Sequence, residues 1–310
     1  MGLEFMNTFV ATAILSTFVA LPLGLLWSAD TKADRDDSKE DVPDIKVTAT
    51  PTMIAIPLTK FKMGGNPHND KKVSQALQEN RDLSVHRRDM VPKHTVVFTH
   101  RFEMGVTEVT QEQWMDVMGN NPSYHQACGP TCPVEQVSWF DVILYTNRLS
   151  TKHGLEPCYV IQGEKVSWPK GYACKGYRLP TESEWEGTAR SPTQKTVEDR
   201  GPRFVKKYAW TRHNSNETTH PVATRKVDQM GLYDMRGNVW EWTWDRYGRY
   251  MPGKSVDPKG AKKSRKNRRR VFRGGSAFNG FEENTRKFRN HWLPAGRDMN
   301  IGFRLARTIE

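Results

Sequence analysis

The residues with the clearest chemistry are four cysteines in one part of the chain: Cys128, Cys132, Cys158 and Cys174. The first two form a CGPTC motif, whose spacing allows a tight local bridge. The other two flank a segment typical of two short strands around Gly163 and Glu164, and a bridge between them would close that hairpin. Zinc is the alternative, but these spacings are not those of common zinc sites. The pattern favours two disulfides and therefore an oxidising compartment.

The segment GLYDMRGNVWEW, from Gly231 to Trp242, combines acids, glycines and aromatic rings in twelve residues. It shows neither the helical period nor the alternation of a strand. Calcium takes six to eight oxygen ligands, and an irregular loop containing glycine can direct backbone carbonyls inward beside carboxylates. The segment is therefore a candidate calcium loop. The alternative is a packed turn whose tryptophans fill the core.

A basic stretch from Lys254 to Arg273 contains ten Lys and Arg residues and a single acid, Asp257, and supplies most of the net charge of +12. One interpretation is a solvated loop between two core strands. The other is an electrostatic contact with anionic lipid headgroups or an acidic protein partner. Nucleic acid is disfavoured, because no aromatic residue precedes Phe272 in the stretch to stack on bases. The predicted contact residues are Lys262, Lys263, Arg265, Lys266, Arg268, Arg269 and Arg270.

The N-terminal segment is strongly apolar, with no charged residue between Glu4 and Asp30. Phe9–Trp27 is long enough to cross a bilayer, which needs about 20 residues. A cleaved signal sequence is the alternative, but no basic residue precedes the apolar span and the sequence after it is a poor cleavage site. With the cysteines, an anchor predicts a single-pass protein of a bacterial inner membrane whose domain lies in the periplasm. The predicted organisation is a transmembrane anchor at 1–29, a polar tether at 30–49 and a globular domain at 50–310.

The elements that must position these residues are short. With 36% hydrophobic residues and 10 tryptophans, the chain is expected to form a loop-rich fold whose core is built from large rings. MIAIPLTKFKMGG and HTVVFTHRFEMG each predict a pair of short strands. Three helices are predicted to begin after Thr110, Ser138 and Thr181, and Gln113 and Glu184 complete capping boxes at the first and the third.

Seven motifs occur in an order that resembles the formylglycine-generating enzyme (sulfatase-modifying factor) family, over about residues 50–308. Single motifs such as RGGS are weak, but seven in order are specific. They are MIAIPLTKFKMGG, EVTQEQW, CPVEQVSWFDVILYTNRLS, GYRLPTESEWEGTAR, GLYDMRGNVWEWTWD, VFRGGSAFN and NIGFRLAR. The resemblance implies a single compact α+β domain related to the C-type lectin fold, with few helices, short strands and long, well-packed loops.

The resemblance also implies a calcium site. In relatives whose metal sites are occupied, the segment matching GLYDMRGNVWEW binds calcium. The implied ligands here are the carboxylates of Asp234 and Glu241 and the backbone carbonyls of Gly237 and Val239. The second calcium site of the family is not expected, because the segment WTRHNSNETTHPV lacks a clear set of acidic ligands.

The same resemblance argues against copper chemistry. In oxidase members, two cysteines bind copper as thiolates at positions that here hold Asn279 and Asn284. Asparagine cannot supply the soft anionic ligand that copper(I) requires, and all four cysteines lie far upstream. We therefore expect no copper cofactor and no formylglycine synthesis by that mechanism. We also assign no catalytic residue.

Three functions are compatible with these sequence features. The first is a membrane-anchored, non-catalytic accessory subunit, whose domain binds another protein of an envelope or membrane complex. The second is a periplasmic maturation enzyme of the same family that works without the copper cysteines. The third is a variable ligand-binding receptor, since some relatives diversify the surface that matches residues 276–300. The missing cysteines, the predicted anchor and the basic stretch favour the first.

Overall fold

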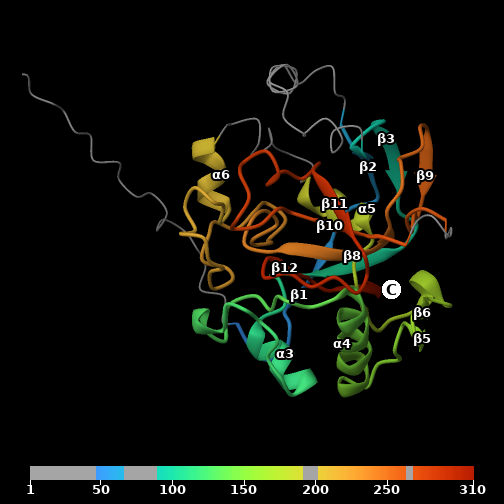
Figure 1. Cartoon of the computed structure of the whole chain (residues 1–310). Helices are drawn as coiled ribbons and strands as arrows, with labels where there is room; N and C mark the ends of the chain where they lie inside the picture. Colours follow the sequence, from blue (N-terminus) through green and yellow to red (C-terminus); the bar gives the residue numbers. More distant parts are fainter. Residues whose placement is uncertain (1–46, 66–88, 191–201, 263–267) are drawn as a thin grey trace, which may run out of the picture. The chain divides into compact units, whose positions relative to one another are not determined.

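The computed structural model describes residues 47–65, 89–190, 202–262 and 268–310, with two four-stranded sheets at its centre (Figure 1). The described residues fall within one unit, Ser38–Glu310. Short strands outnumber the helices in this part of the chain, which confirms the predicted loop-rich α+β class.

The first central sheet has the strand order β11-β10-β8-β12. β8 pairs antiparallel with β10 and parallel with β12, and β10 also pairs antiparallel with β11. The strands are β8 (Trp240–Arg246), β10 (Arg270–Arg273), β11 (Arg289–Trp292) and β12 (Ile301–Gly302). This sheet therefore joins the end of the candidate calcium loop to the end of the basic stretch.

The second central sheet has the order β1-β4-β13-β7 and is antiparallel throughout. It brings the first and last strands of the described chain into one sheet. Its strands are β1 (Met53–Ile56), β4 (Arg101–Gly105), β7 (Tyr177–Arg178) and β13 (Ala306–Ile309).

Two smaller sheets complete the fold. The three-stranded sheet β2-β3-β9 and the hairpin β5-β6 consist of β2 (Lys60–Met63), β3 (His94–Val97), β9 (Lys254–Val256), β5 (Val160–Gln162) and β6 (Lys165–Ser167). The strands predicted in HTVVFTHRFEMG are therefore present as β3 and β4. They do not pair with each other, however, because the three residues between them cross from one sheet to another.

Capping boxes begin the three predicted helices. In α3 (Gln111–Met118), the hydroxyl of Thr110 accepts a hydrogen bond from the backbone N–H of Gln113, whose side chain accepts one from the N–H of Thr110. The same reciprocal pair begins α4 (Trp139–Lys152) and α5 (Glu182–Ala189). Each box satisfies backbone donors that have no partner within the helix. The remaining helical segments are α6 (Pro202–Tyr208), η3 (Gln126–Cys128) and η4 (Gly171–Ala173).

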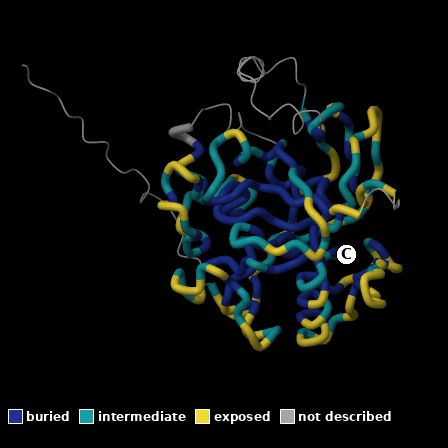
Figure 2. Tube along the Cα trace, viewed as in Figure 1, coloured by how far each residue is buried: buried dark blue, intermediate teal, exposed yellow. Residues whose placement is uncertain are grey.

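The core contains the large rings that the composition predicts, and Figure 2 shows it as the dark strands at the centre of the fold. The larger of two buried clusters includes Trp139, Trp242 and Phe303. The indole N–H of Trp242 donates to the carbonyl of Val137 over 3.0 Å, and that of Trp139 donates to the carbonyl of Thr243 over 2.9 Å. Each tryptophan thus buries its ring while satisfying its polar atom.

The segment Gly231–Trp242 ends in a strand, although its sequence shows no alternation. Trp240, Glu241 and Trp242 begin β8, whose first four residues are all buried. A strand that is covered on both faces has no solvent side, so the alternation of polar and apolar residues is lost. The interpretation of the whole segment as irregular was therefore wrong for its last three residues.

The predicted anchor at 1–29 and most of the tether at 30–49 lie outside the described residues. Within the described part of the chain, no helix has the length and apolar character needed to cross a membrane. The anchor therefore stays a prediction.

All four cysteines form disulfides, Cys128–Cys132 and Cys158–Cys174, as predicted. The second bridge joins the two ends of the segment that contains the β5–β6 hairpin. Two bridges are typical of an oxidising, extracytoplasmic environment and exclude a zinc site built on these thiols.

Replacing both Cys158 and Cys174 by alanine is expected to lower the free energy of unfolding by about 3 kcal/mol, because the bridge spans 16 positions. Removing the Cys128–Cys132 bridge, which spans 4 positions, is expected to cost less, about 2 kcal/mol. Urea denaturation of the full chain in detergent measures both losses. A larger loss from the shorter loop would contradict the explanation by loop entropy.

Candidate functional site

The two positions that correspond to copper-binding cysteines stabilise a turn. The hydroxyl of Ser276 donates to the side-chain oxygen of Asn279 over 2.6 Å. The amide of Asn284 is fully buried and donates to the carbonyls of Asn279 and Gly280 over 2.9 and 2.7 Å. Gly275 has φ +75°, and a Cβ there would lie 2.1 Å from the side-chain oxygen of Asn284. Only glycine fits beside this amide.

This arrangement leaves no thiol for copper. Asn279 and Asn284 hold their positions through neutral hydrogen bonds, and every cysteine of the chain is used in a disulfide. Copper(I) binds soft thiolate and thioether ligands rather than amides. The thiolate pair that binds copper in the oxidase members therefore has no counterpart at these two positions.

The candidate calcium loop leads into β8, and its last three residues form the start of that strand. Gly237 has φ +77° and is packed so closely on the backbone of Trp210 that a Cβ would lie 1.9 Å from its carbonyl oxygen. The carboxylate of Glu241 accepts a two-pronged ion pair from Arg304, with both N···O distances at 2.7 Å. The indole N–H of Trp185 donates to the same carboxylate over 2.6 Å. Both oxygens of Glu241 are therefore engaged by protein donors.

Two other carboxylates in this region keep oxygens without partners. Asp234 accepts a hydrogen bond from the backbone N–H of Ala223 on Oδ2, but its Oδ1 has no hydrogen-bond partner. Glu108 is fully buried, and neither of its carboxylate oxygens has one. Burial raises the pKa of Asp234 to about 6. Burial, together with repulsion by Asp234, holds the pKa of Glu108 well above its usual range.

We call Glu108, Asp234, Glu241 and Arg304 the carboxylate cluster. When ionised, its three carboxylates carry three negative charges against one guanidinium, so the cluster has a charge of −2. A divalent cation would balance that charge, and the unpartnered oxygens of Asp234 and Glu108 are the hard ligands that calcium prefers. The residues therefore fit calcium by charge and donor type. No group of three or more His, Cys, Asp or Glu side chains is arranged as a metal site within the described ranges. Backbone carbonyls would thus have to supply further ligands.

Sequence reasoning named Asp234 and Glu241 but missed Glu108 and Arg304. Both missed residues lie inside quoted motifs, Glu108 in EVTQEQW and Arg304 in NIGFRLAR. An acid before a capping box and an arginine between apolar residues of a strand-like segment are unusual in a core, because a buried charge needs a partner. That argument could have identified Glu108 and Arg304 as candidate site residues. It could not have shown that the two lie in the same cluster.

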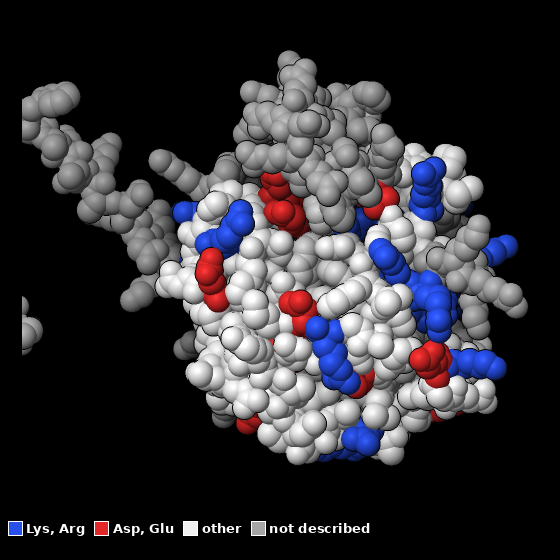
Figure 3. Space-filling model, in the orientation of Figure 1, with Lys and Arg blue, Asp and Glu red and all other residues white. Residues whose placement is uncertain are grey.

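The basic stretch divides into exposed and buried residues. Lys262, Arg268 and Arg269 are exposed, whereas Lys263, Arg265 and Lys266 lie outside the described residues. On the face in Figure 3, basic side chains gather on the right, beside acidic ones. Arg270 is not part of the exposed surface of the stretch, because it is only 4% exposed. As the first residue of β10 it packs its guanidinium on Trp139, so it belongs to the sheet.

Comparison with known proteins places these features in a family. The sulfatase-modifying factor enzyme 1-like domain matches residues 38–309. The chain belongs to this family. Among curated relatives of this sulfatase-modifying factor domain, "Chaperone protein LppX" of Paenibacillus barcinonensis is 37% identical over 46% of this chain and 62% of its own length. The formylglycine-generating enzyme of Streptomyces coelicolor is 28% identical over 58% of this chain and 54% of its own length.

The solved structure of Treponema denticola variable protein 1 is similar to this sulfatase-modifying factor domain, with a TM-score of 0.70 and 32% identity. The alignment covers 84% of this chain and 95% of that protein. The match spans less than two thirds of the length of the two curated relatives above. The α+β fold of this family, predicted from the motifs, is therefore confirmed. The activities of the longer relatives cannot be assigned to this chain from such partial matches.

Proposed function

We propose that this sulfatase-modifying factor domain is a membrane-anchored, non-catalytic binding protein that acts as an accessory subunit of an envelope or membrane complex. The observation that carries the proposal is that all four cysteines are used in disulfides while Asn279 and Asn284 stabilise a turn. The domain therefore keeps the fold of the family but lacks the thiolates that bind copper in its oxidase members. A relative named as a chaperone supports a role in binding other proteins.

The proposed location is a bacterial inner membrane, with the domain in the periplasm. The disulfides support the oxidising side of the membrane, and the apolar residues 1–29 supply the proposed anchor. The proposed contact with an acidic partner or anionic lipid uses the exposed residues of the basic stretch, such as Lys262, Arg268 and Arg269. Arg270 is left out of this surface because it is buried.

The test is purification from membranes of the native organism in mild detergent. A stoichiometric complex that survives gel filtration supports the accessory role, and a free monomer favours a maturation enzyme. Deleting residues 1–29 is expected to release the domain into the soluble fraction. The double variant Arg268→Glu/Arg269→Glu is then expected to weaken the complex more than Lys152→Glu, which removes a basic residue on α4.

We also propose that calcium binds beside the carboxylate cluster, held by the carboxylates of Asp234 and Glu108 and the carbonyls of Gly237 and Val239, while Glu241, the remaining predicted ligand, stays paired with Arg304. The unpartnered oxygens of Glu108 and Asp234 support this proposal. Bound calcium would neutralise the buried charge and fix the loop that leads into β8.

Calcium is expected to raise the melting temperature, and more so at about pH 7.5 than at about pH 5. In the folded, metal-free domain the pKa of Asp234 is raised to about 6 from 3.8, so its carboxyl favours the protonated form. Metal-free stability therefore falls as pH rises from about 4 to about 6, because ionisation of the buried group becomes costly. At about 100 times its Kd, calcium adds about 2.7 kcal/mol.

Differential scanning fluorimetry with calcium or chelator measures this effect. Asp234→Asn is expected to reduce it, whereas the exposed Asp116→Asn is the matched control. Identical melting curves with calcium and with chelator at both pH values would reject the site.

A second candidate, a variable ligand-binding receptor, is favoured by the 32% identity to Treponema denticola variable protein 1 over 95% of that protein. The corresponding surface of this chain, residues 276–300, exposes the apolar side chains of Trp292 and Leu293. Sequencing the gene from many isolates of one population tests the idea. Variation concentrated at residues 276–300 would support a receptor, and uniform sequence there would reject it.

A further inference from the structure

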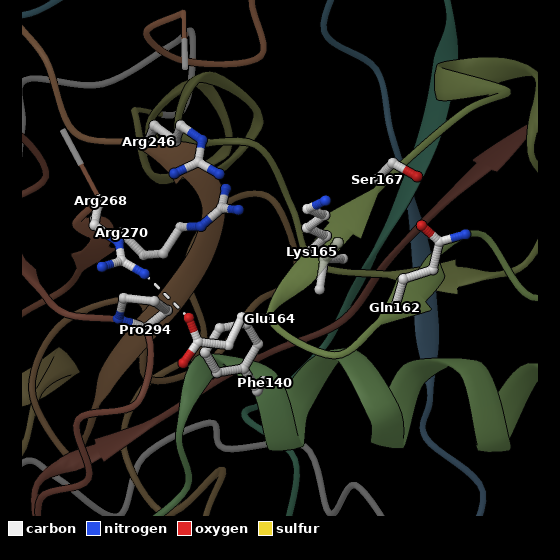
Figure 4. Close-up of a pocket in the computed structure, with 10 residues that line it drawn as sticks. Phe140, Gln162, Glu164, Lys165, Ser167, Arg246, Arg268, Arg270 and Pro294 are labelled. Atoms are coloured by element: carbon white, nitrogen blue, oxygen red, sulfur yellow. Dashed lines mark hydrogen bonds and ion pairs between the residues drawn. The ribbon is translucent and has the colours of Figure 1, made fainter. Parts of the chain in front are cut away.

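A cavity of about 1050 Å³ opens between the β5–β6 hairpin, the start of α4 and the adjoining ends of β8 and β10 (Figure 4). Its basic lining comes from three segments far apart in the sequence: Lys165 on β6, Arg246 at the end of β8, and Arg268 and Arg270 around the start of β10. Phe140 and Pro294 add apolar walls. The disulfide-closed hairpin therefore forms one side of a basic cavity against the central sheet.

The described lining of this cavity is mainly basic. Among the described residues of the lining, Glu164 is the one acidic side chain, and four are basic: Lys165, Arg246, Arg268 and Arg270. Glu164 pairs with Arg268 over 3.0 Å at the rim, where both side chains are exposed. Basic side chains therefore outnumber acidic ones in this part of the lining.

Arg270 is the most constrained of the four. Its guanidinium packs 3.7 Å from the ring centroid of Trp139, and it donates from Nη1 to the carbonyl of Trp244. Its Nε is buried without a hydrogen-bond partner. Burial, and then repulsion by Arg246, lowers the pKa of Arg270 to about 9. Figure 4 shows the guanidinium groups of Arg246 and Arg270 close together at one end of the cavity. An anion at this end would relieve their repulsion.

We propose that this cavity binds a ligand through a phosphate monoester or diphosphate group, held by Arg246, Arg270 and Lys165. A phosphate monoester carries close to two negative charges and offers three acceptor oxygens, so it suits several basic side chains better than a single carboxylate does. Guanidinium groups match those oxygens with paired N–H donors. Phe140 and Pro294 lie where an apolar or ring portion of the ligand would pack. The inference deepens the proposed binding role and rests on it.

The test is isothermal titration of inorganic pyrophosphate into the full chain in zwitterionic detergent. Binding is expected to weaken with added salt. Lys165→Gln and Arg246→Gln are each expected to raise the Kd about tenfold or more, the loss of one charge-assisted contact. The matched control is Lys170→Gln, an exposed lysine that pairs with Glu156 and does not line the cavity.

Lys165→Gln changes an exposed residue of the hairpin, so it keeps the test valid if Arg246→Gln does not fold. The proposal is overturned if the wild type shows no heat of binding at millimolar pyrophosphate, or if Lys165→Gln binds as tightly as the control. Sedimentation with phosphatidic acid vesicles then distinguishes the two possible sources of the phosphate group. Vesicle binding that is lost in Lys165→Gln assigns a lipid headgroup. Binding to pyrophosphate but not to vesicles assigns a soluble phosphate compound. Pyrophosphate binding by a free monomer would leave the site standing while the accessory-subunit role fails.

Discussion

Glu182→Gln is expected to lower the free energy of unfolding by about 3–5 kcal/mol, because it leaves the buried guanidinium of Arg289 without its carboxylate partner and removes one of the two that pair with Arg273. Glu182, at the start of α5, accepts a two-pronged pair from Arg289 over 2.7 and 2.6 Å. It also accepts a hydrogen bond from Arg273 over 2.7 Å and one from Tyr250 over 3.0 Å. One carboxylate thus joins α5 to β10, to β11 and to the loop after β8.

The network extends beyond Glu182. Arg273 also pairs with Glu186 over 2.8 Å, and Arg289 donates to the carbonyls of Asp89 and Gly248. Because these partners come from distant parts of the chain, one substitution should weaken several elements together. The total stability of a domain is about 5–15 kcal/mol, so such a loss is a large fraction of it.

Urea denaturation of the full chain in detergent measures the loss. Glu156→Gln is the matched control, since Glu156 pairs with Lys170 in an exposed ion pair that contributes about 0–1 kcal/mol. Equal midpoints for the two variants would contradict the view that this network holds α5 against the sheets.

The second large effect is expected at the carboxylate cluster, where Arg304→Met should also cost about 3–5 kcal/mol. Arg304 is fully buried, and besides its pair with Glu241 it donates to the carbonyls of Gly105 and Tyr233, each over 3.0 Å. Its removal leaves three carboxylates without the cation that stabilises their ionised forms.

A double-mutant cycle with Glu241→Gln isolates the pair. The double variant is expected to lose less stability than the sum of the two single losses, because neither group is then left with an unpaired charge. The control is Arg297→Met, whose partner Asp141 lies in a more exposed pair. Strict additivity of Arg304→Met and Glu241→Gln would show that the two side chains do not stabilise each other.

Local chemistry explains what the sequence predicted well. The boxes at Thr110 and Thr181 depend on residues three positions apart, and the hairpin around Gly163 depends on a short turn between two cysteines. In each case the interacting groups are near neighbours in the chain. The order of whole motifs then identified the family and its fold, since a single motif would not have been specific enough.

The rest depends on contacts between distant residues. Arg270 sits in a run of basic residues that looks like a solvated loop, yet tryptophans from α4 and β8 cover its guanidinium. Glu108 and Arg304 lie almost 200 positions apart, and only the fold brings them into one cluster. Charge counts along the chain cannot distinguish an exposed arginine from a buried one whose partners come from elsewhere.

The most direct test of the central claim, that this sulfatase-modifying factor domain binds rather than oxidises, is a turnover assay on a cysteine-containing peptide. The full chain is incubated with copper(I), oxygen and the peptide, and mass spectrometry follows the peptide. The Streptomyces coelicolor formylglycine-generating enzyme serves as the positive control. With all four cysteines in disulfides and amides at positions 279 and 284, the peptide is expected to remain unchanged. Copper-dependent conversion of the cysteine to formylglycine would contradict the account.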